Sequence, residues 1–244
     1  MKLLAAGITE VGGRGVNEDS FSIFNRSPWD CFVVADGLGG HGAGEVASLT
    51  AVQTIGSSFL QRPGYDEASL SGYIVNAQQE ILRIQQSNSR YRNMRTTVVV
   101  LATDGRRASW AHVGDSRLYM FRDQRILFHT LDQSVPQALV RIGEISFEQI
   151  RFHEDRNRLL QALGSSNPPK IEMGPGPVSL KTGDAFLLCT DGFWEWVAEN
   201  EMEEDLQKAK SCGHWLELMT KRIITRAKPG NDNYSAVGVF VKEG

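Results

Sequence analysis

The sequence predicts an α+β fold, a four-layer α-β-β-α sandwich in which two antiparallel sheets stack on each other and helices cover their outer faces. Short apolar or β-branched runs come first, two amphipathic helical segments follow, and further strands, a helix and a closing strand complete the chain. This order lacks the regular alternation of strand and helix that builds a parallel sheet. With 244 residues, 41% of them hydrophobic, the chain can bury a substantial core, and we expect a single domain over residues 1–244.

The first third of the chain contributes three strands and two helices. Strands are expected where the chain is apolar or β-branched and bounded by turn residues, over 3–9, 20–24 and 30–35. Apolar residues then recur at helical spacing over 46–59 and 70–84. Each of these two helices should lay one apolar face on a sheet.

The middle of the chain predicts a β-meander followed by an excursion. Residues 96–103 are rich in β-branched side chains, and Asp104-Gly105 is a hairpin turn signal, so we expect the meander to continue through 108–113, 118–122 and 126–129. From 133 to 164 the pattern weakens into short helical pieces with many charges. We interpret this stretch as a surface flap.

The last third of the chain is expected to supply the remaining strands and a covering helix of the sandwich. It predicts strands over 171–173, 185–190 and 234–241 and a helix over 212–226. The acidic stretch 199–205 is interpreted as solvated surface on a short helix, without a function of its own.

Charge and cysteine content exclude several classes of protein. The net charge of -3 gives no basic footprint for nucleic acid, and no segment approaches the length of a membrane span. The three cysteines are an odd number without CxxC spacing, and the apolar stretch at the N-terminus is too short for a signal peptide. We therefore expect a cytoplasmic protein. We also expect a monomer.

Four strand-like runs each meet an aspartate at one end. These are Asp36, Asp115, Asp191 and Asp232. If the strands lie in antiparallel sheets, the aspartates could converge on one rim, where the carboxylates would repel one another unless hard cations lay between them. Oxygen-only ligation favours Mg²⁺ or Mn²⁺.

Two further segments carry polar groups suited to a phosphate site. Residues 36–44 hold five glycines, which let the backbone approach a ligand closely before a helix begins. Residues 14–19 place Arg14 near Glu18 and Asp19, so that a guanidinium can hold a phosphate while a carboxylate bonds metal-bound water. Taken singly, the second segment is equally well explained as a polar turn.

Together, the motifs resemble the metal-dependent protein phosphatase family, also called the phosphatase 2C family, in its bacterial form. The match runs in the family's order through Arg14-Gly15-Val16-Asn17-Glu18-Asp19, Asp36-Gly37-Leu38-Gly39-Gly40-His41, Thr96-Thr97, Val113-Gly114-Asp115-Ser116-Arg117, Cys189-Thr190-Asp191-Gly192 and Asp232-Asn233-Tyr234-Ser235. Each fragment alone is a weak to moderate signal, whereas six in the right order are a strong one.

The resemblance implies a role for each matched residue. Asp36 would bridge two metal ions, and the carbonyl of Gly37 would ligate one of them. Asp191 and Asp232 would hold the other ion, and Glu18 and Asp19 would act through bound water. Arg14 would bind the substrate phosphate, and Asp115 with Asp191 matches a third metal site of bacterial relatives.

The chain departs from the family's eukaryotic pattern after the Asp-Gly pair. Leu38 stands where those members have a histidine that acts as general acid. His41 lies three residues further on, but a lone histidine in a glycine-rich loop is more often structural than catalytic. Either His41 or metal-bound water could protonate the leaving group, and we favour water.

The expected function is hydrolysis of phosphoserine and phosphothreonine in proteins with Mn²⁺ or Mg²⁺, in opposition to a bacterial Ser/Thr kinase. One alternative is a catalytically weak regulator that keeps the fold to bind phosphoproteins, although such a protein would be expected to lose metal carboxylates. Another is a phosphatase for small metabolites or for a stress pathway, which would share the site and differ in the flap.

Overall fold

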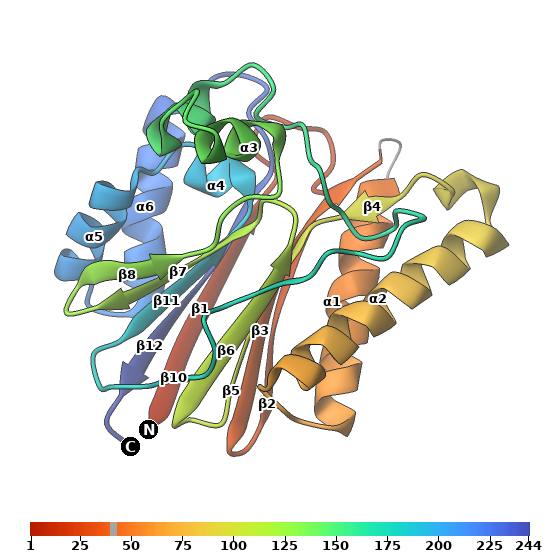
Figure 1. The fold of residues 1–244 in the computed structure, drawn as a ribbon. Coiled ribbons are helices and arrows are strands. Elements are labelled where there is room, and N and C mark those ends of the chain that lie inside the picture. Colours follow the sequence, from red (N-terminus) through yellow and green to blue (C-terminus); the bar gives the residue numbers. More distant parts are fainter. Residues whose placement is uncertain (40–42) are drawn as a thin grey trace.

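Two antiparallel sheets stack in the centre of the molecule, and the computed structural model describes residues 1–39 and 43–244 of the chain (Figure 1). The first sheet has the order β1 (Lys2–Glu10), β12 (Tyr234–Lys242), β11 (Ala185–Cys189), β7 (Arg117–Arg122) and β8 (Arg125–His129). The second has the order β10 (Val178–Ser179), β6 (Arg107–Val113), β5 (Val98–Thr103), β3 (Trp29–Leu38) and β2 (Asp19–Arg26), with β4 (Arg95–Thr96) beside β3 and β9 (Glu172–Met173) beside β6.

Helices cover the outer face of each sheet, as the sequence predicts. The long helices α1 (Ala43–Gln61) and α2 (Glu67–Ser87) lie on the second sheet, and α5 (Glu199–Lys208) and α6 (Cys212–Arg226) lie on the first (Figure 1). Two short elements, α3 (Val135–Arg141) and the 3₁₀ helix η2 (Phe147–Phe152), belong to the predicted flap, and α4 (Asp191–Trp194) directly follows β11. A further 3₁₀ turn, η1 (Ser89–Tyr91), follows α2.

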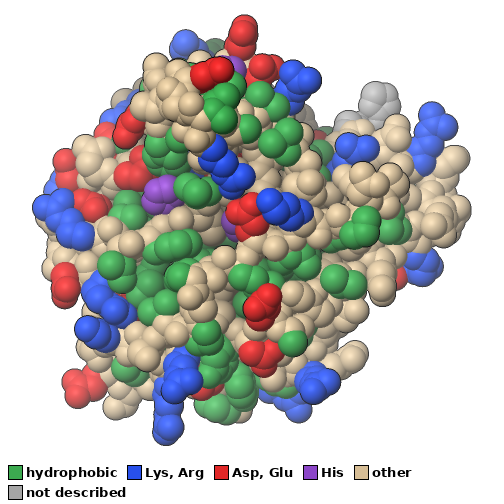
Figure 2. Space-filling view, viewed as in Figure 1, with side chains coloured by type: hydrophobic (Ala, Val, Ile, Leu, Met, Phe, Trp, Pro, Cys, Tyr) green, Lys and Arg blue, Asp and Glu red, His purple; other side chains and the backbone are tan. Residues whose placement is uncertain are grey.

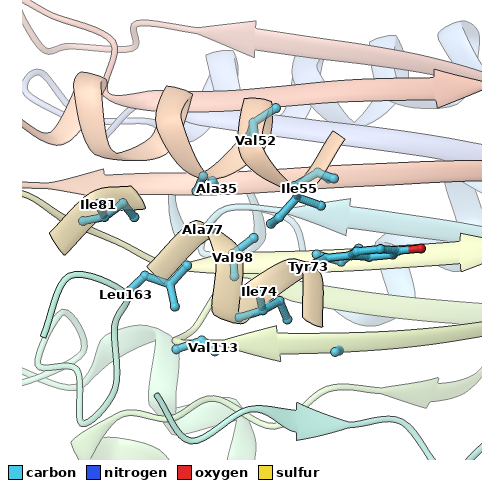
Figure 3. Close-up of a cluster of buried hydrophobic side chains, with 14 of the residues drawn as sticks. Ala35, Val52, Ile55, Tyr73, Ile74, Ala77, Ile81, Val98, Val113 and Leu163 are labelled. Atoms are coloured by element: carbon cyan, nitrogen blue, oxygen red, sulfur yellow. The ribbon is translucent and has the colours of Figure 1, made fainter. Parts of the chain in front are cut away.

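Three apolar clusters fill the spaces between the four layers. Successive side chains of a strand point to opposite faces of its sheet, so β3 contributes to two of the clusters. Ala35 packs under α1 and α2 in the cluster shown in Figure 3, and Val34 packs between the sheets. The third cluster joins the first sheet to α5 and α6 around Trp215. The predicted four-layer sandwich is confirmed.

The predicted meander over 96–129 is wrong in one respect. β5 and β6 form a hairpin in the second sheet, but β6 does not pair with β7, which lies in the first sheet. The chain crosses between the sheets at Gly114, whose φ of +102° is in the left-handed region that favours glycine. Local strand propensity carries no information about which sheet a strand joins. The crossover places Asp115 between the two layers.

Cationic and anionic side chains are interspersed over the face shown in Figure 2, and the residues drawn in colour there form no continuous basic patch. Within residues 1–39 and 43–244, no helix has the length and apolar character needed to cross a membrane.

Candidate active site

The four aspartates that end strand-like runs lie around one cavity of about 430 Å³ at a rim of the sandwich. Its lining comprises Arg14, Val16, Glu18, Asp36, Gly37, Leu38, Gly39, Asp115, Asn157, Leu159, Asp191, Asp232 and Asn233. Both sheets contribute: Asp36 is on β3 of the second sheet, whereas Asp191 and Asp232 flank β11 and β12 of the first. The expected convergence of these residues is therefore present in the structure.

The backbone of Asp36 is held by the Thr96-Thr97 pair. The carbonyl oxygen of Asp36 accepts bonds from Thr96 Oγ1 at 2.8 Å and from the Thr97 amide at 2.9 Å, and the Asp36 amide donates to Thr97 Oγ1 at 3.1 Å. Thr97 Oγ1 also lies 2.7 Å from Ser116 Oγ, directly after Asp115. The two threonines thus connect the backbone positions of two candidate ligands.

Gly37 occupies a place that no larger residue could fill. A Cβ atom there would come within 2.1 Å of the Gly44 carbonyl oxygen and 2.5 Å of the Glu18 carbonyl oxygen. The Gly37 amide donates to that Glu18 oxygen at 3.1 Å, and Glu18 Oε1 accepts a bond from the Gly44 amide at 3.2 Å. Close contact between β3, the start of α1 and Glu18 is therefore what requires glycine here.

Four carboxyl groups at or beside the cavity are destabilised in their charged forms, namely Asp19, Asp36, Asp115 and Asp191. Burial and the neighbouring charge of Asp191 raise the pKa of Asp36 well above its usual range, and the same two causes raise the pKa of Asp115. Burial raises the pKa of Asp19 to about 7, even though Thr190 Oγ1 donates a 2.9 Å hydrogen bond to it. Burial and the charge of Asp232 raise the pKa of Asp191 to about 6. A nearby cation would stabilise all of these carboxylates.

The donor set fits Mn²⁺ or Mg²⁺ in chemical type. The predicted side-chain ligands Asp36, Asp115, Asp191 and Asp232 offer only carboxylate oxygens to a metal ion. Asp191 Oδ1 is buried without a hydrogen-bond partner, which is costly unless an ion or a donor lies against it. Across the described part of the chain, no three acidic, histidine or cysteine side chains are arranged to close around a single ion as they stand. The metal-ligand assignments remain predictions.

Arg14 forms an ion pair with one of these carboxylates. Its Nη2 atom lies 2.8 Å from Asp232 Oδ2, and half of the Arg14 side chain is exposed. An exposed guanidinium at the cavity edge is free to exchange partners at small cost. The position is compatible with the predicted contact to a substrate phosphate.

Asn233 organises the segment that carries Arg14, a role that the sequence analysis did not assign. Its amide nitrogen donates to the carbonyls of Val11 at 2.8 Å and Val16 at 3.0 Å, and its Oδ1 atom accepts from the Glu18 amide at 2.8 Å. The Asp-Asn motif marked the position, but only the fold shows that the amide closes a loop more than 200 residues away.

Two cavity residues come from the flap, namely Asn157 and Leu159. The sequence predicted a flap over 133–164 but had no signal for which of its side chains would reach the cavity. Leu38 also lines the cavity. His41, which with metal-bound water is a candidate for protonating the leaving group, lies outside the described residues.

Comparison with known proteins agrees with this architecture. The family model described as protein phosphatase 2C matches residues 12–228, and the chain belongs to that family. It is 33% identical over 229 residues to the serine/threonine phosphatase stp of Listeria monocytogenes, covering 91% of this chain and 88% of that protein. It is 30% identical over 203 residues to protein phosphatase PhpP of Streptococcus pneumoniae, with 81% of each chain covered.

Solved structures show the same fold. The serine/threonine phosphatase PstP of Mycobacterium tuberculosis superposes with a TM-score of 0.86 at 28% identity over 99% of both chains. The catalytic domain of PstP in complex with two manganese ions superposes with a TM-score of 0.82, also at 28% identity over 99% of both chains. The bacterial form of the phosphatase 2C family, expected from the motifs, is confirmed.

Proposed function

We propose that this protein hydrolyses phosphoserine and phosphothreonine in proteins and uses Mn²⁺ or Mg²⁺ as its cofactor. The observation that carries the proposal is the single cavity in which Asp36, Asp115, Asp191 and Asp232 meet next to Arg14. A cavity of about 430 Å³ is in the size range of sites that enclose a small group such as a phosphorylated side chain. Membership in a family whose relatives are serine/threonine phosphatases supports the same substrate class.

The family resemblance suggests a role for each residue, and the positions of these residues at the cavity support it. Asp36, Asp191 and Asp232, with the carbonyl of Gly37, would hold two ions, and Asp115 with Asp191 would hold a third. Glu18 and Asp19 would orient water bound at these ions. Divalent ions, when bound, supply charge neutralisation and activate water for attack on phosphorus.

The protein's own groups bind and orient the phosphate. Arg14 would leave Asp232 and form a charge-assisted pair with the phosphate oxygens, since a guanidinium matches two oxygens of a phosphate at once. Leu38 and the flap residue Leu159 present apolar side chains to the same cavity. They would limit the water around the bound phosphate and strengthen the electrostatic contacts within the cavity.

The test is release of inorganic phosphate from a phosphothreonine peptide with Mn²⁺, with and without a chelator, by wild-type protein and Asp191→Asn. We expect release by the wild type with Mn²⁺ only, and none above background by the variant. Peptide binding without release by metal-loaded wild type would identify the regulator instead. Equal release in chelator would refute metal dependence.

We also propose that the protein opposes a Ser/Thr kinase of the same bacterium, acts in the cytoplasm and is a monomer. The bacterial serine/threonine phosphatases among its relatives support the first point, and three free, buried cysteines are consistent with the second. Dephosphorylation of that organism's autophosphorylated kinase and a mass near 27.1 kDa by light scattering are the expected results.

A further inference from the structure

One buried indole connects the two parts of the chain that carry Asp115 and Asp191. Trp194 lies on α4, the helix that begins at Asp191, and only 1% of it is exposed. Its Nε1 atom donates a hydrogen bond of 3.0 Å to the main-chain carbonyl of Asp115. Asp115 lies in the crossover between the sheets, so this bond links the crossover to the end of β11.

The buried guanidinium of Arg117 packs against the indole of Trp194. The guanidinium of Arg117 lies 3.5 Å from the centre of the Trp194 ring, and Arg117 is 1% exposed. Two hydrogen bonds of 2.7 Å fix that guanidinium to the carboxylate of Asp132, and a third, of 3.0 Å, joins it to the hydroxyl of Tyr119. A desolvated cation over an aromatic face is a strong contact of this kind, so the ring has little freedom to rotate.

The flap rests on the same stack. The ring of Phe147, in η2, lies 4.9 Å from the Arg117 guanidinium carbon, and Arg151 lies 5.6 Å from the Trp194 ring. Arg151 is tied in turn to Glu199 by a hydrogen bond of 2.6 Å. Trp194 is therefore held on the side of the flap as well as on the side of the sheet.

We propose that Trp194 is a positioning residue, which sets the separation of the Asp115 and Asp191 carboxylates and thereby the affinity of the cavity for a divalent ion that the two share. The proposal rests on the proposed function, because it assumes that these carboxylates bind metal. Trp194 touches neither substrate nor ion. It acts through the backbone of Asp115 and through its own place three residues after Asp191.

The structure offers a matched control for the indole. Trp215 is also fully buried, and its Nε1 atom donates to the carbonyl of Met202 at 3.1 Å, on the far side of the first sheet. Trp194→Phe and Trp215→Phe each remove one buried indole donor. Only Trp194→Phe removes it from the chain segment that carries a candidate ligand.

Direct Mn²⁺ binding, measured from the electron paramagnetic resonance signal of free Mn²⁺, tests the proposal without relying on activity. We expect Trp194→Phe to bind one Mn²⁺ equivalent about 10-fold or more weakly than the wild type, the usual scale for groups that orient ligands. Trp215→Phe should bind Mn²⁺ as the wild type does. Trp194 would be merely structural if folded Trp194→Phe binds Mn²⁺ with the wild-type affinity and both variants melt at similarly lowered temperatures.

A measurement on the wild type decides the matter if Trp194→Phe does not fold. The wild-type protein is labelled with ¹⁵N at its indole nitrogens and observed by NMR. The indole resonances are assigned through Trp→Phe changes at the other four tryptophans. We expect a Mg²⁺ titration to shift the Trp194 signal and to leave the Trp215 signal in place. A Trp194 signal that stays unmoved at saturating Mg²⁺ would overturn the proposal. The same wild-type preparation is also tested for hydrolysis of the phosphothreonine peptide. Metal-dependent phosphate release with an unmoved Trp194 signal would refute only the role of Trp194. The absence of any metal-dependent release would refute the proposed function.

Discussion

At the scale of single residues, the site is a group of carboxylates that the fold makes costly to ionise together. Burial and mutual repulsion raise the pKa values of Asp36, Asp115 and Asp191. Arg14 is the cationic side chain that pairs with this group in the structure, through Asp232. Binding of divalent ions would relieve the repulsion and free the guanidinium for the substrate.

Arg14→Ala should mainly weaken binding of the phosphate. A guanidinium contacts the phosphate in both the ground and transition states, so we expect KM for a phosphothreonine peptide to rise about 10-fold and kcat to fall less. Steady-state kinetics with Mn²⁺ measure both constants. Arg83→Ala is the matched control, because Arg83 also forms an exposed ion pair, with Glu80, but lies outside the cavity lining. If KM and kcat of Arg14→Ala both equal the wild-type values, Arg14 is only a turn residue.

Leu38 raises the question of what protonates the leaving group. A protein alkoxide leaves poorly without a proton, whereas the leaving group of p-nitrophenyl phosphate needs little help. If water held through Asp115 supplies the proton, Asp115→Ala should slow the phosphopeptide more than p-nitrophenyl phosphate, whereas His41→Ala should change the two rates by similar factors. A defect confined to the phosphopeptide, and confined to His41→Ala, would instead identify His41 as the acid.

At the scale of elements, the loop that carries Arg14 depends on one side chain of another segment. Asn233 makes three hydrogen bonds to the loop and to Glu18, and a buried hydrogen bond contributes about 1 kcal/mol. Asn233→Ala should therefore open the loop about 10- to 100-fold more often. Limited proteolysis with trypsin, read by mass spectrometry, should show correspondingly faster cleavage after Arg14.

Asn231→Ala provides the comparison for this experiment. Asn231 is also next to Asp232, but its side chain makes one hydrogen bond, to the Asp232 carbonyl. Its cleavage rate should stay near that of the wild type. Equal cleavage of wild type and Asn233→Ala would show that other contacts hold the loop.

The acidic stretch at the start of α5 is more than the solvated surface that the sequence suggested. Glu201 accepts hydrogen bonds from Arg222 and Arg226 of α6, and those from Arg226 lower its pKa from 4.5 to about 2. A carboxylate with a lowered pKa stabilises the fold above pH 4.5 and loses that contribution as the pH falls toward 2. Paired charges at a partly solvated site are screened, so we expect about 1 kcal/mol.

Glu201→Gln should therefore lower the free energy of unfolding at pH 7 and have little effect near pH 2.5. Urea titrations at the two pH values measure the difference. Glu217→Gln, an exposed change on α6 at a residue outside every ion pair of the described chain, serves as control and should have little effect at either pH. A loss of stability for Glu201→Gln that is the same at both pH values would rule out the ionic explanation.

At the scale of the whole molecule, the cavity lies where the two sheets meet, so metal binding should couple to global stability. Mn²⁺ at 100 times its dissociation constant should stabilise the fold by about 2.7 kcal/mol, and raise Tm by about 5–10 °C for a chain of this size. Thermal melts with Mn²⁺ and with chelator measure this shift.

Asp36→Asn should lose most of that shift, and its Tm in chelator should not fall below the wild-type value, because the change removes a charge from a repulsive cluster. Asp104→Asn is the control: Asp104 caps the hairpin turn between β5 and β6 by accepting bonds from the amides of Arg106 and Arg107. It should keep the full Mn²⁺ shift. A full shift in Asp36→Asn would contradict the assignment of Asp36 as a ligand.

The sequence alone determined the layers, the candidate carboxylates and the family, because strand alternation, helical periodicity and short motifs are local patterns. Only the tertiary structure decided that the chain changes sheets at Gly114, that Asn233 ties down the loop of Arg14, and that the indole of Trp194 holds the backbone of Asp115. Each of these features depends on residues that are far apart in the chain or lie in different layers. Local pattern carries no information about which distant side chain will complete such a contact, since that depends on how the two sheets stack.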